Sequence, residues 1–228
     1  SITTEAPRPD AELVAELARF PTTQIADGGG PIAVVGPGIG PMGAATEICG
    51  PAVTLWTAPG DILYILKSPD LVQPGDVLVI DGGGRLDAAV IGDVIGGRLL
   101  ANGCAGIVAD AAVRDLEGLQ ALGLPVHARG AHPATGSNVG PGALNVPIQC
   151  GGVAVHPGDV VRADRSGVVV VRAGGLAEVV ERTRAVGARE DEWQAAFADG
   201  AGLDAVFGID ALIAEKAAAA GATGGPEA

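Results

Sequence analysis

Apolar residues recur at two spacings along the chain, and these spacings predict an alternation of helices and strands. In residues 10–19 and 176–198 they fall three or four positions apart, which is typical of helices with one buried face. Segment 21–60 is rich in Pro and Gly and carries only short apolar pieces, so it predicts loops and short strands. The remaining pattern predicts helices at 93–102, 116–122 and 210–219 and strands at 106–110, 125–128 and within 143–172.

One short sequence occurs twice. Pro-Gly-Asp-Val stands at 74–77 and again at 157–160, and each copy leads through three further residues, Leu-Val-Ile or Val-Arg-Ala, to a second aspartate, Asp81 or Asp164, at identical spacing. A Pro-Gly-Asp turn followed by residues of this kind is typical of a turn that feeds a strand. We therefore predict two similarly built strands in a β-rich core, and we interpret the aspartates of both copies as turn residues rather than catalytic groups.

Acidic side chains outnumber basic ones by 27 to 14, which gives a formal net charge of −13. A field of this sign repels a phosphate backbone, so nucleic acid is not an expected partner. A small anionic substrate meets the same field and needs a local cationic anchor. The arginines close to a candidate site therefore matter more than the overall balance.

Composition points to a core of small side chains, because hydrophobic residues make up 48% of the chain and aromatic residues only 3%. No apolar run approaches the ~18 residues that span a bilayer. Residues 1–10 lack the basic-then-apolar pattern of a signal peptide. We expect a cytoplasmic protein with no membrane partner. The three cysteines form no C-x-x-C pair, which argues against a zinc cluster or a disulfide framework.

The residues with the clearest chemical potential are Asp93, Arg114 and Asp115. Asp93 stands at a predicted helix start, where the amides of Val94 and Ile95 have no partner within the helix and can hold a carboxylate. Arg114 offers a planar fork for the carboxylate and carbonyl of a 2-oxo acid. Asp115 can give one hard oxygen to Mg²⁺ or Mn²⁺. Taken alone, the same residues also suit a helix cap and a solvated ion pair.

The spacing favours the functional interpretation. Gly92-Asp93, then twenty residues, then Arg114-Asp115 resembles the signature of metal-dependent pyruvate aldolases that act on 4-hydroxy-4-methyl-2-oxoglutarate and 4-carboxy-4-hydroxy-2-oxoadipate. Those aldolases share a fold with the regulator of ribonuclease activity A family. The resemblance runs from about residue 15 to about residue 195 and includes Thr23–Asp27, Gly75–Gly82, Arg114–Leu119, Gly140–Pro147 and Gly151–Val153.

This resemblance implies a class II, divalent-metal-dependent aldolase that releases pyruvate from a 4-hydroxy-2-oxo acid. Asp115 would bind Mg²⁺ or Mn²⁺, and Arg114 would bind the pyruvyl group and stabilise its enolate. The amides of Val94 and Ile95 would hold the carboxylate. Asp93 would hydrogen-bond a water on the cation that acts as the base.

Members of the family also use a Glu from a neighbouring subunit, and Glu190 is the candidate here. Some relatives carry an acid one position after Glu117, where this chain has Gly118. A class I aldolase would need a Schiff-base lysine, and neither Lys67 nor Lys216 suits that role. The three histidines, His127, His132 and His156, are interpreted as polar filler or loop residues.

The resemblance further implies a swivelling β/β/α domain of the α/β class, with a β-rich core, flanking helices and a C-terminal helical arm. We predict a catalytic domain at 1–175 and an interface-forming helical extension at 176–228, assembled as a homotrimer or homohexamer. Two alternatives remain open. One is a non-catalytic, protein-binding regulator, which is typically shorter, near 160 residues. The other is decarboxylation of a 2-oxo acid such as oxaloacetate through the same enolate.

Overall fold

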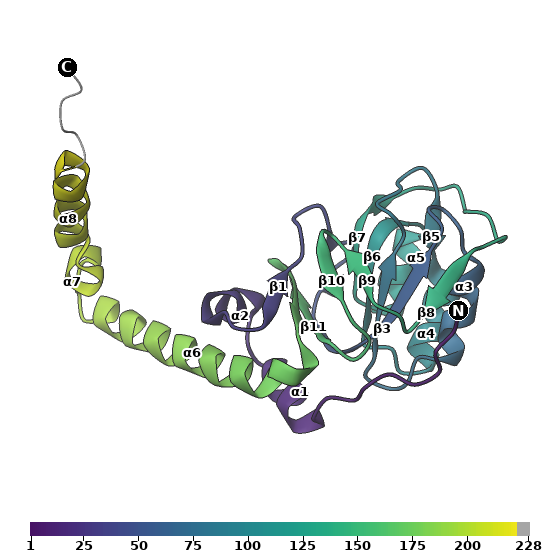
Figure 1. The fold of residues 1–228 in the computed structure, drawn as a ribbon, viewed down its shortest axis with the longest axis horizontal. Helices are drawn as coiled ribbons and strands as arrows, with labels where there is room; N and C mark the ends of the chain where they lie inside the picture. Colours follow the sequence, from purple (N-terminus) through teal and green to yellow (C-terminus); the bar gives the residue numbers. More distant parts are fainter. Residues whose placement is uncertain (223–228) are drawn as a thin grey trace, which may run out of the picture. The chain divides into compact units, whose positions relative to one another are not determined.

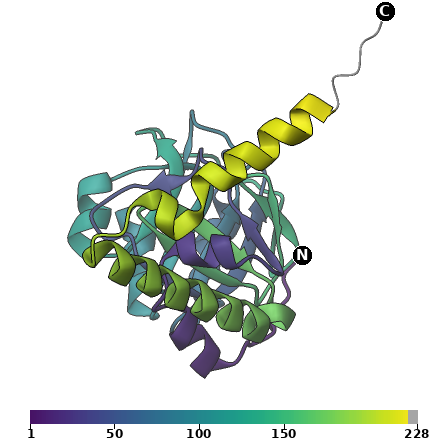
Figure 2. The ribbon, with the colours of Figure 1, turned by 90° about the vertical axis from the view of Figure 1, so that its left-hand side faces the viewer.

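The computed structural model describes residues 1–222 in two compact units, Ser1–Thr183 and Arg184–Ala228. The first unit holds the sheets and most of the helices (Figures 1 and 2). Helix α6 (Leu176–Ala198) begins in this unit and continues in the second, which also contains α7 (Leu203–Phe207) and α8 (Ile209–Ala222). The last part of the predicted extension, 223–228, lies outside the described residues.

The helices of the first unit all precede β7 in the chain, apart from the first turns of α6. The helices are α1 (Ala11–Leu17), α2 (Thr22–Gly28), α3 (Leu63–Lys67), α4 (Asp93–Ala101) and α5 (Leu116–Leu122), with 3-10 turns η1 (Ser68–Asp70) and η2 (Ala173–Gly175). The first strands are β1 (Ile32–Val34), β2 (Gly40–Pro41), β3 (Ile48–Thr57), β4 (Val77–Asp81), β5 (Ala89–Ile91) and β6 (Gly106–Val113). The later strands are β7 (Val126–Ala131), β8 (Gly142–Leu144), β9 (Ile148–Cys150), β10 (Val153–Val155), β11 (Val160–Asp164) and β12 (Gly167–Val171).

Strand β3 joins two differently built halves of a ten-stranded sheet. Its first residues pair antiparallel with β11, and from Ala52 onward it pairs parallel with β4. The order β1-β12-β11-β3 is antiparallel, whereas β3-β4-β6-β7 is parallel, with β5 also parallel to β6. At the changeover a side chain on Gly50 would place Cβ 2.0 Å from the carbonyl oxygen of Gly75, so only glycine fits there.

The core is built from aliphatic side chains, in line with the low aromatic content. One buried cluster packs α3, α4 and α5 against the parallel half of the sheet and includes Leu99, Leu119 and Ile107. Another lies under α1, α2 and the first turns of α6. The predicted α/β class, with a β-rich core, flanking helices and C-terminal helices, is confirmed.

The repeated Pro-Gly-Asp-Val sequence forms the same structure twice. The glycine takes a left-handed conformation in both copies, with φ of 86° at Gly75 and 83° at Gly158. The next residue, Asp76 or Asp159, is buried and accepts a hydrogen bond from the amide three positions before it, at 2.8 and 2.9 Å. The later aspartate of each copy accepts one from the amide two positions further on. The interpretation of these aspartates as turn residues is confirmed.

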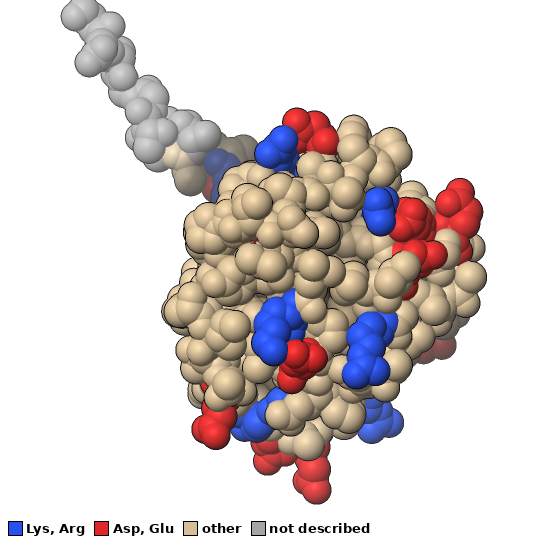
Figure 3. Space-filling view, turned by 90° about the vertical axis from the view of Figure 1, so that its right-hand side faces the viewer, with Lys and Arg blue, Asp and Glu red and all other residues tan. Residues whose placement is uncertain are grey.

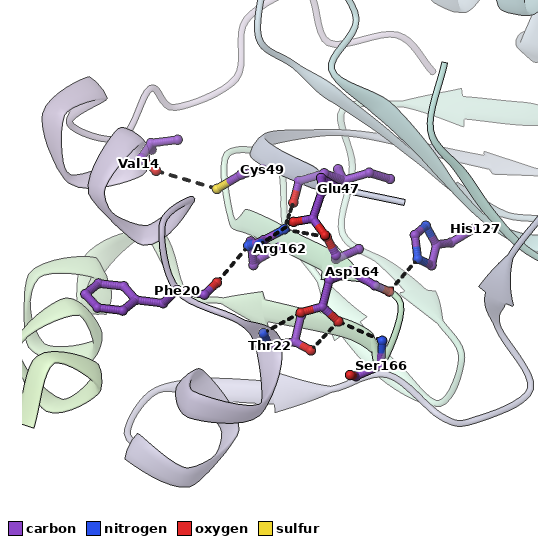
Figure 4. A network of polar contacts seen from close by, with 11 residues as sticks. Val14, Phe20, Thr22, Glu47, Cys49, His127, Arg162, Asp164 and Ser166 are labelled. Carbon is purple, nitrogen blue, oxygen red and sulfur yellow. Dashed lines mark hydrogen bonds and ion pairs between the residues drawn. The ribbon is translucent and has the colours of Figure 1, made fainter. Parts of the chain in front are cut away.

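The prediction of loops and short strands for 21–60 is wrong in two places, because this segment contains helix α2 and the ten-residue strand β3. Helix α2 follows Pro21 and has no side-chain cap. It is held by distant contacts instead: both the amide and the hydroxyl of Thr22 donate to Asp164, each at 2.7 Å (Figure 4). A bond between residues 142 positions apart leaves no local pattern in the sequence.

The same region contains a buried polar network (Figure 4). The guanidinium of Arg162 is nearly buried, pairs with Glu47 at 2.6 Å and donates to the carbonyl of Phe20. His127 is fully buried, and its Nε2 lies 2.9 Å from the carbonyl oxygen of Asp164, so Nε2 carries the proton. Burial lowers the pKa of His127. His127 is therefore a neutral structural group, as the sequence indicated.

No helix of residues 1–222 is long and apolar enough to cross a membrane. On the face that lies at the right of Figure 1, charged side chains are scattered singly or beside groups of opposite sign, among many uncharged ones (Figure 3). An anionic ligand on this face would therefore depend on individual basic side chains rather than on a broad basic surface.

A buried carboxylate ties the parallel strands to the β9–β10 hairpin. Asp110 of β6 is 1% exposed and accepts hydrogen bonds from Arg129 of β7, from Gln149 at 3.1 Å and from the amide of Gly151 at 2.8 Å. Burial alone would raise the pKa of Asp110. The bonds from Arg129, Gly151 and Gln149 outweigh burial and hold that pKa below its ordinary value.

We expect Asp110→Asn to lower the free energy of unfolding at pH 7 by about 1–3 kcal/mol, because Arg129 loses its buried charge partner and one acceptor oxygen is replaced by an amide group that faces other donors. A depressed pKa stabilises the fold above the unfolded value of about 3.9, and this contribution is lost as the pH falls below it. The difference between wild type and variant in urea unfolding should therefore shrink between pH 5 and pH 3. A difference that stays constant over this range would contradict the assigned role.

Candidate active site

Three parallel strands end side by side and deliver the candidate residues to one edge of the sheet. Strands β5 and β7 both pair with β6 in parallel, so their carboxyl ends lie at the same edge. Asp93 follows β5 after one residue, and Arg114-Asp115 follows β6 directly. The amide of Arg114 donates to the carbonyl of Ile91, the last residue of β5, at 2.9 Å. This edge is where open α/β sheets bind ligands.

Two glycines let the candidate residues approach one another closely. A Cβ on Gly92 would stand 2.3 Å from a carboxylate oxygen of Asp115, and a Cβ on Gly118 would stand 2.5 Å from a carboxylate oxygen of Asp93. Asp115 therefore packs on Gly92, the residue before Asp93. Asp93 in turn packs on Gly118, which follows Asp115 in the chain. The twenty-residue spacing in the sequence corresponds to α4 and β6, and the fold brings its two ends into contact.

Asp115 has an unusual backbone conformation. Its φ and ψ are 54° and 48°, in the left-handed region that non-glycine residues rarely adopt. Its side chain caps no amide of α5 and instead faces Arg114, whose Nε lies 3.3 Å from Oδ2 of Asp115. The two side chains are 38% and 41% exposed, so both are open to a ligand. Backbone strain of this kind tends to persist at functional sites.

The start of α4 offers two further donors at the same place. The amide of Gly96 donates to the carbonyl of Gly92 at 2.9 Å. The amides of Val94 and Ile95 precede that bond and have no acceptor inside the helix. The side chain of Val94 is 78% exposed, so this helix start is open to solvent. The geometry needed for the predicted carboxylate contacts is therefore present.

A cavity of about 340 Å³ opens beside Arg114 and Asp115. Its other charged or titratable residues are Glu117 and His132, and the complete lining is Arg114, Asp115, Leu116, Glu117, Ala131, His132 and Pro133. The interpretation of His132 as a loop residue missed this placement. The signal that could have found it is its position directly after β7, the third parallel strand that ends at this edge.

The donor chemistry fits a hard cation that keeps most of its waters. Among residues 1–222 no group of three or more His, Cys, Asp or Glu is placed to hold a metal. The partly exposed carboxylate of Asp115, with Asp93 packed nearby, matches the one or two carboxylates with which proteins commonly bind Mg²⁺. It does not match the four-ligand set of a structural zinc site.

Glu190 belongs to a different part of the molecule. It lies half-buried in α6, within the second unit, whereas the other candidate residues all lie in the first. The first unit of one chain therefore brings together Asp93, Arg114 and Asp115 but does not contain Glu190.

Comparison with known proteins gives two kinds of relatives. Residues 22–170 match the RraA-like family, described as Aldolase/RraA. A protein of Halalkalibacterium halodurans named "Putative 4-hydroxy-4-methyl-2-oxoglutarate aldolase" is 34% identical over 190 residues, which cover 83% of this chain and 90% of that protein.

Two solved structures share the fold over most of both chains. An uncharacterized protein from Pseudomonas syringae pv. tomato superposes with a TM-score of 0.78 at 31% identity, covering 88% of this chain and 98% of its own. Streptomyces coelicolor RraAS2, described as an unusual member of the RNase ES inhibitor RraA protein family, gives 0.73 at 31% identity, covering 86% and 100%. The relatives thus carry both enzyme and regulator names.

The close approach at Gly118 can be tested by adding one methyl group. In Gly118→Ala the new Cβ would clash with the carboxylate, Cγ and Cβ of Asp93, so Asp93 must move. We expect a folded protein that has lost most of the ligand binding or turnover of this site. The matched control is Gly97→Ala in α4, whose Cβ would meet Leu122 at an ordinary 3.8 Å and should leave the site unchanged. Equal behaviour of the two variants would remove Asp93 from the site.

Proposed function

The chain belongs to the RraA-like family, and on that premise we propose that it is a divalent-metal-dependent aldolase. The substrate is a 4-hydroxy-2-oxo acid such as 4-hydroxy-4-methyl-2-oxoglutarate or 4-carboxy-4-hydroxy-2-oxoadipate, and the products are pyruvate and a second 2-oxo acid. The observation that carries the proposal is the contact between the Gly92-Asp93 and Arg114-Asp115 segments at the carboxyl ends of β5 and β6.

Arg114 is the anchor for the pyruvyl end of the substrate. Its guanidinium is partly exposed and lines the cavity of about 340 Å³. A bidentate contact to the substrate carboxylate and the 2-oxo oxygen uses the planar geometry of this group. The amides of Val94 and Ile95 supply further donors to the carboxylate. Together these groups give an anionic substrate the local cationic site that a chain of net charge −13 requires.

The reaction moves one proton and breaks one carbon–carbon bond. The C4 hydroxyl loses its proton, C4 becomes a carbonyl, and the C3–C4 electron pair passes into a pyruvate enolate. Protonation of C3 then gives pyruvate. Arg114 stabilises the enolate oxygen, and Asp93 accepts a hydrogen bond from a water that receives the hydroxyl proton and passes one of its own protons to the Asp93 carboxylate. Asp115 would hold the divalent cation, whose chemical contribution would be Lewis acidity toward the 2-oxo group.

Oxaloacetate suits the same site as a second substrate. In this case the C3–C4 bond breaks with loss of carbon dioxide, and the electron pair again enters a pyruvate enolate. The contacts of Arg114 to the developing oxyanion are unchanged. We therefore propose oxaloacetate decarboxylation as a side activity of the same residues.

We further propose a homotrimer or homohexamer in which Glu190 of one chain completes the site of another. One observation in support is that Glu190 lies in the second unit, outside the first unit, which holds Asp93, Arg114 and Asp115. A second is that the second unit exposes several large apolar side chains, namely Leu203, Phe207, Leu212 and Ile213. Surfaces of this kind are typical of interfaces.

The second candidate function is a protein-binding regulator of the RraA type, which the name of the Streptomyces coelicolor relative favours. Chain length does not separate the two functions, since that relative aligns over its entire length with 86% of this chain. The discriminating feature is the side-chain set at the strand ends, because a regulator has no need of a strained Asp115 beside Arg114.

Pyruvate release from a panel of 4-hydroxy-2-oxo acids and from oxaloacetate tests the proposal. We expect release that requires Mg²⁺ or Mn²⁺ and stops with EDTA. Arg114→Ala should lower turnover by about 10²–10³-fold, as for the loss of one oxyanion donor, whereas Arg98→Ala, a matched charge change in α4, should not. Irreversible inactivation by borohydride with pyruvate, together with indifference to EDTA, would contradict the metal route. Absence of release from every substrate would favour the regulator.

A further inference from the structure

His132 lies beside Arg114, because each residue directly follows one of two paired strands. Val113 and Ala131 are paired in the parallel ladder of β6 and β7, and the next residue of each strand is Arg114 or His132. The amide of His132 donates to the carbonyl of Val113 at 2.9 Å, so the pairing continues to this point. Neighbouring strands are about 4.8 Å apart. Both side chains line the cavity of about 340 Å³.

A backbone contact fixes which nitrogen of His132 carries its proton. The amide of Ala134 donates to Nδ1 of His132 at 3.2 Å, so Nδ1 presents a lone pair. In a neutral imidazole the proton then sits on Nε2. Nε2–H is therefore a donor in the uncharged ring. The structure records no acceptor for it among residues 1–222.

The charges around the cavity call for such a donor. Arg114 is the cation of the lining, whereas Asp115 and Glu117 are acids that repel a substrate with two carboxylates. Asp87 is a further charged residue near His132, and it is exposed and paired with Arg85. Beyond the Arg114 anchor, the Nε2–H of His132 is the side-chain donor that the lining offers to a second anionic group.

We propose that His132 determines specificity by binding the second carboxylate of the substrate. This assignment rests on the proposed function, in which Arg114 holds the 2-oxo acid end. A second contact one strand spacing away matches the length of a short dicarboxylic acid. The site therefore selects 4-hydroxy-2-oxo acids that carry a carboxylate at the far end over monocarboxylic analogues of the same length.

Two conservative variants distinguish the role of Nδ1 of His132 from the role of its Nε2. In His132→Asn the side-chain oxygen can still accept from the Ala134 amide, but the distal donor is gone. In His132→Gln the side-chain amide reaches further and restores a donor near the position of Nε2. If His132 acts only by accepting the Ala134 amide, the Asn variant should behave more like wild type. If His132 binds the second carboxylate, the Gln variant should behave more like wild type.

The readout is calorimetric binding of two ligands in the presence of Mg²⁺, 2-oxoglutarate and 2-oxopentanoate, which differ only in the second carboxylate. We expect wild type to prefer 2-oxoglutarate. His132→Asn should weaken 2-oxoglutarate by about 10- to 100-fold, as for a hydrogen bond to a charged group, and leave 2-oxopentanoate unchanged. His132→Gln should retain most of the preference. On a dicarboxylic substrate, His132→Asn should raise KM far more than it lowers kcat.

The outcomes distinguish this inference from the proposed function. If both ligands bind through Arg114 and pyruvate is released, but His132→Asn leaves the preference intact or weakens both ligands equally, only the assignment of His132 is wrong. If neither ligand binds to wild type and no substrate releases pyruvate, the proposed function and the inference fail together.

Discussion

The candidate site depends on the close approach of two chain segments that follow neighbouring parallel strands. Asp115 rests on Gly92 and Asp93 rests on Gly118, at separations that leave no room for a Cβ on either glycine. Asp115 also takes the left-handed conformation, which costs roughly 1–2 kcal/mol relative to an ordinary one. The surrounding sheet, with Arg114 bonded to the end of β5, holds the arrangement in place.

The rest of the fold positions the edge of the sheet at which the candidate site lies. Strand β3 joins an antiparallel half, which carries the buried network around Arg162 and Asp164, to the parallel half that ends at the site. Asp110 ties β6 to β7 in the middle of the parallel half. The proposed chemistry then needs little more than one carboxylate for a cation, one guanidinium and a few donors, because the strand ends bring these groups to one edge of the sheet.

Sequence reasoning anticipated the elements whose signals are local. Helices α5 and α6 have the predicted bounds, and the repeated Pro-Gly-Asp turns form as expected. Helix α2 was missed because its support is the bond from Thr22 to Asp164, a contact between distant residues. The placement of His132 was missed for a similar reason: its position beside Arg114 follows from the pairing of β6 with β7, which no short motif encodes.

The central claim is that Asp115 is retained for function rather than for the fold. Its strained backbone conformation allows the most direct test of this claim. Asp115→Gly and Asp115→Ala should be compared in urea unfolding and in pyruvate release. The account predicts that the Gly variant is the more stable by about 1 kcal/mol, since glycine adopts positive φ without strain, and that both variants lose pyruvate release. Near-normal release by either variant would contradict the account.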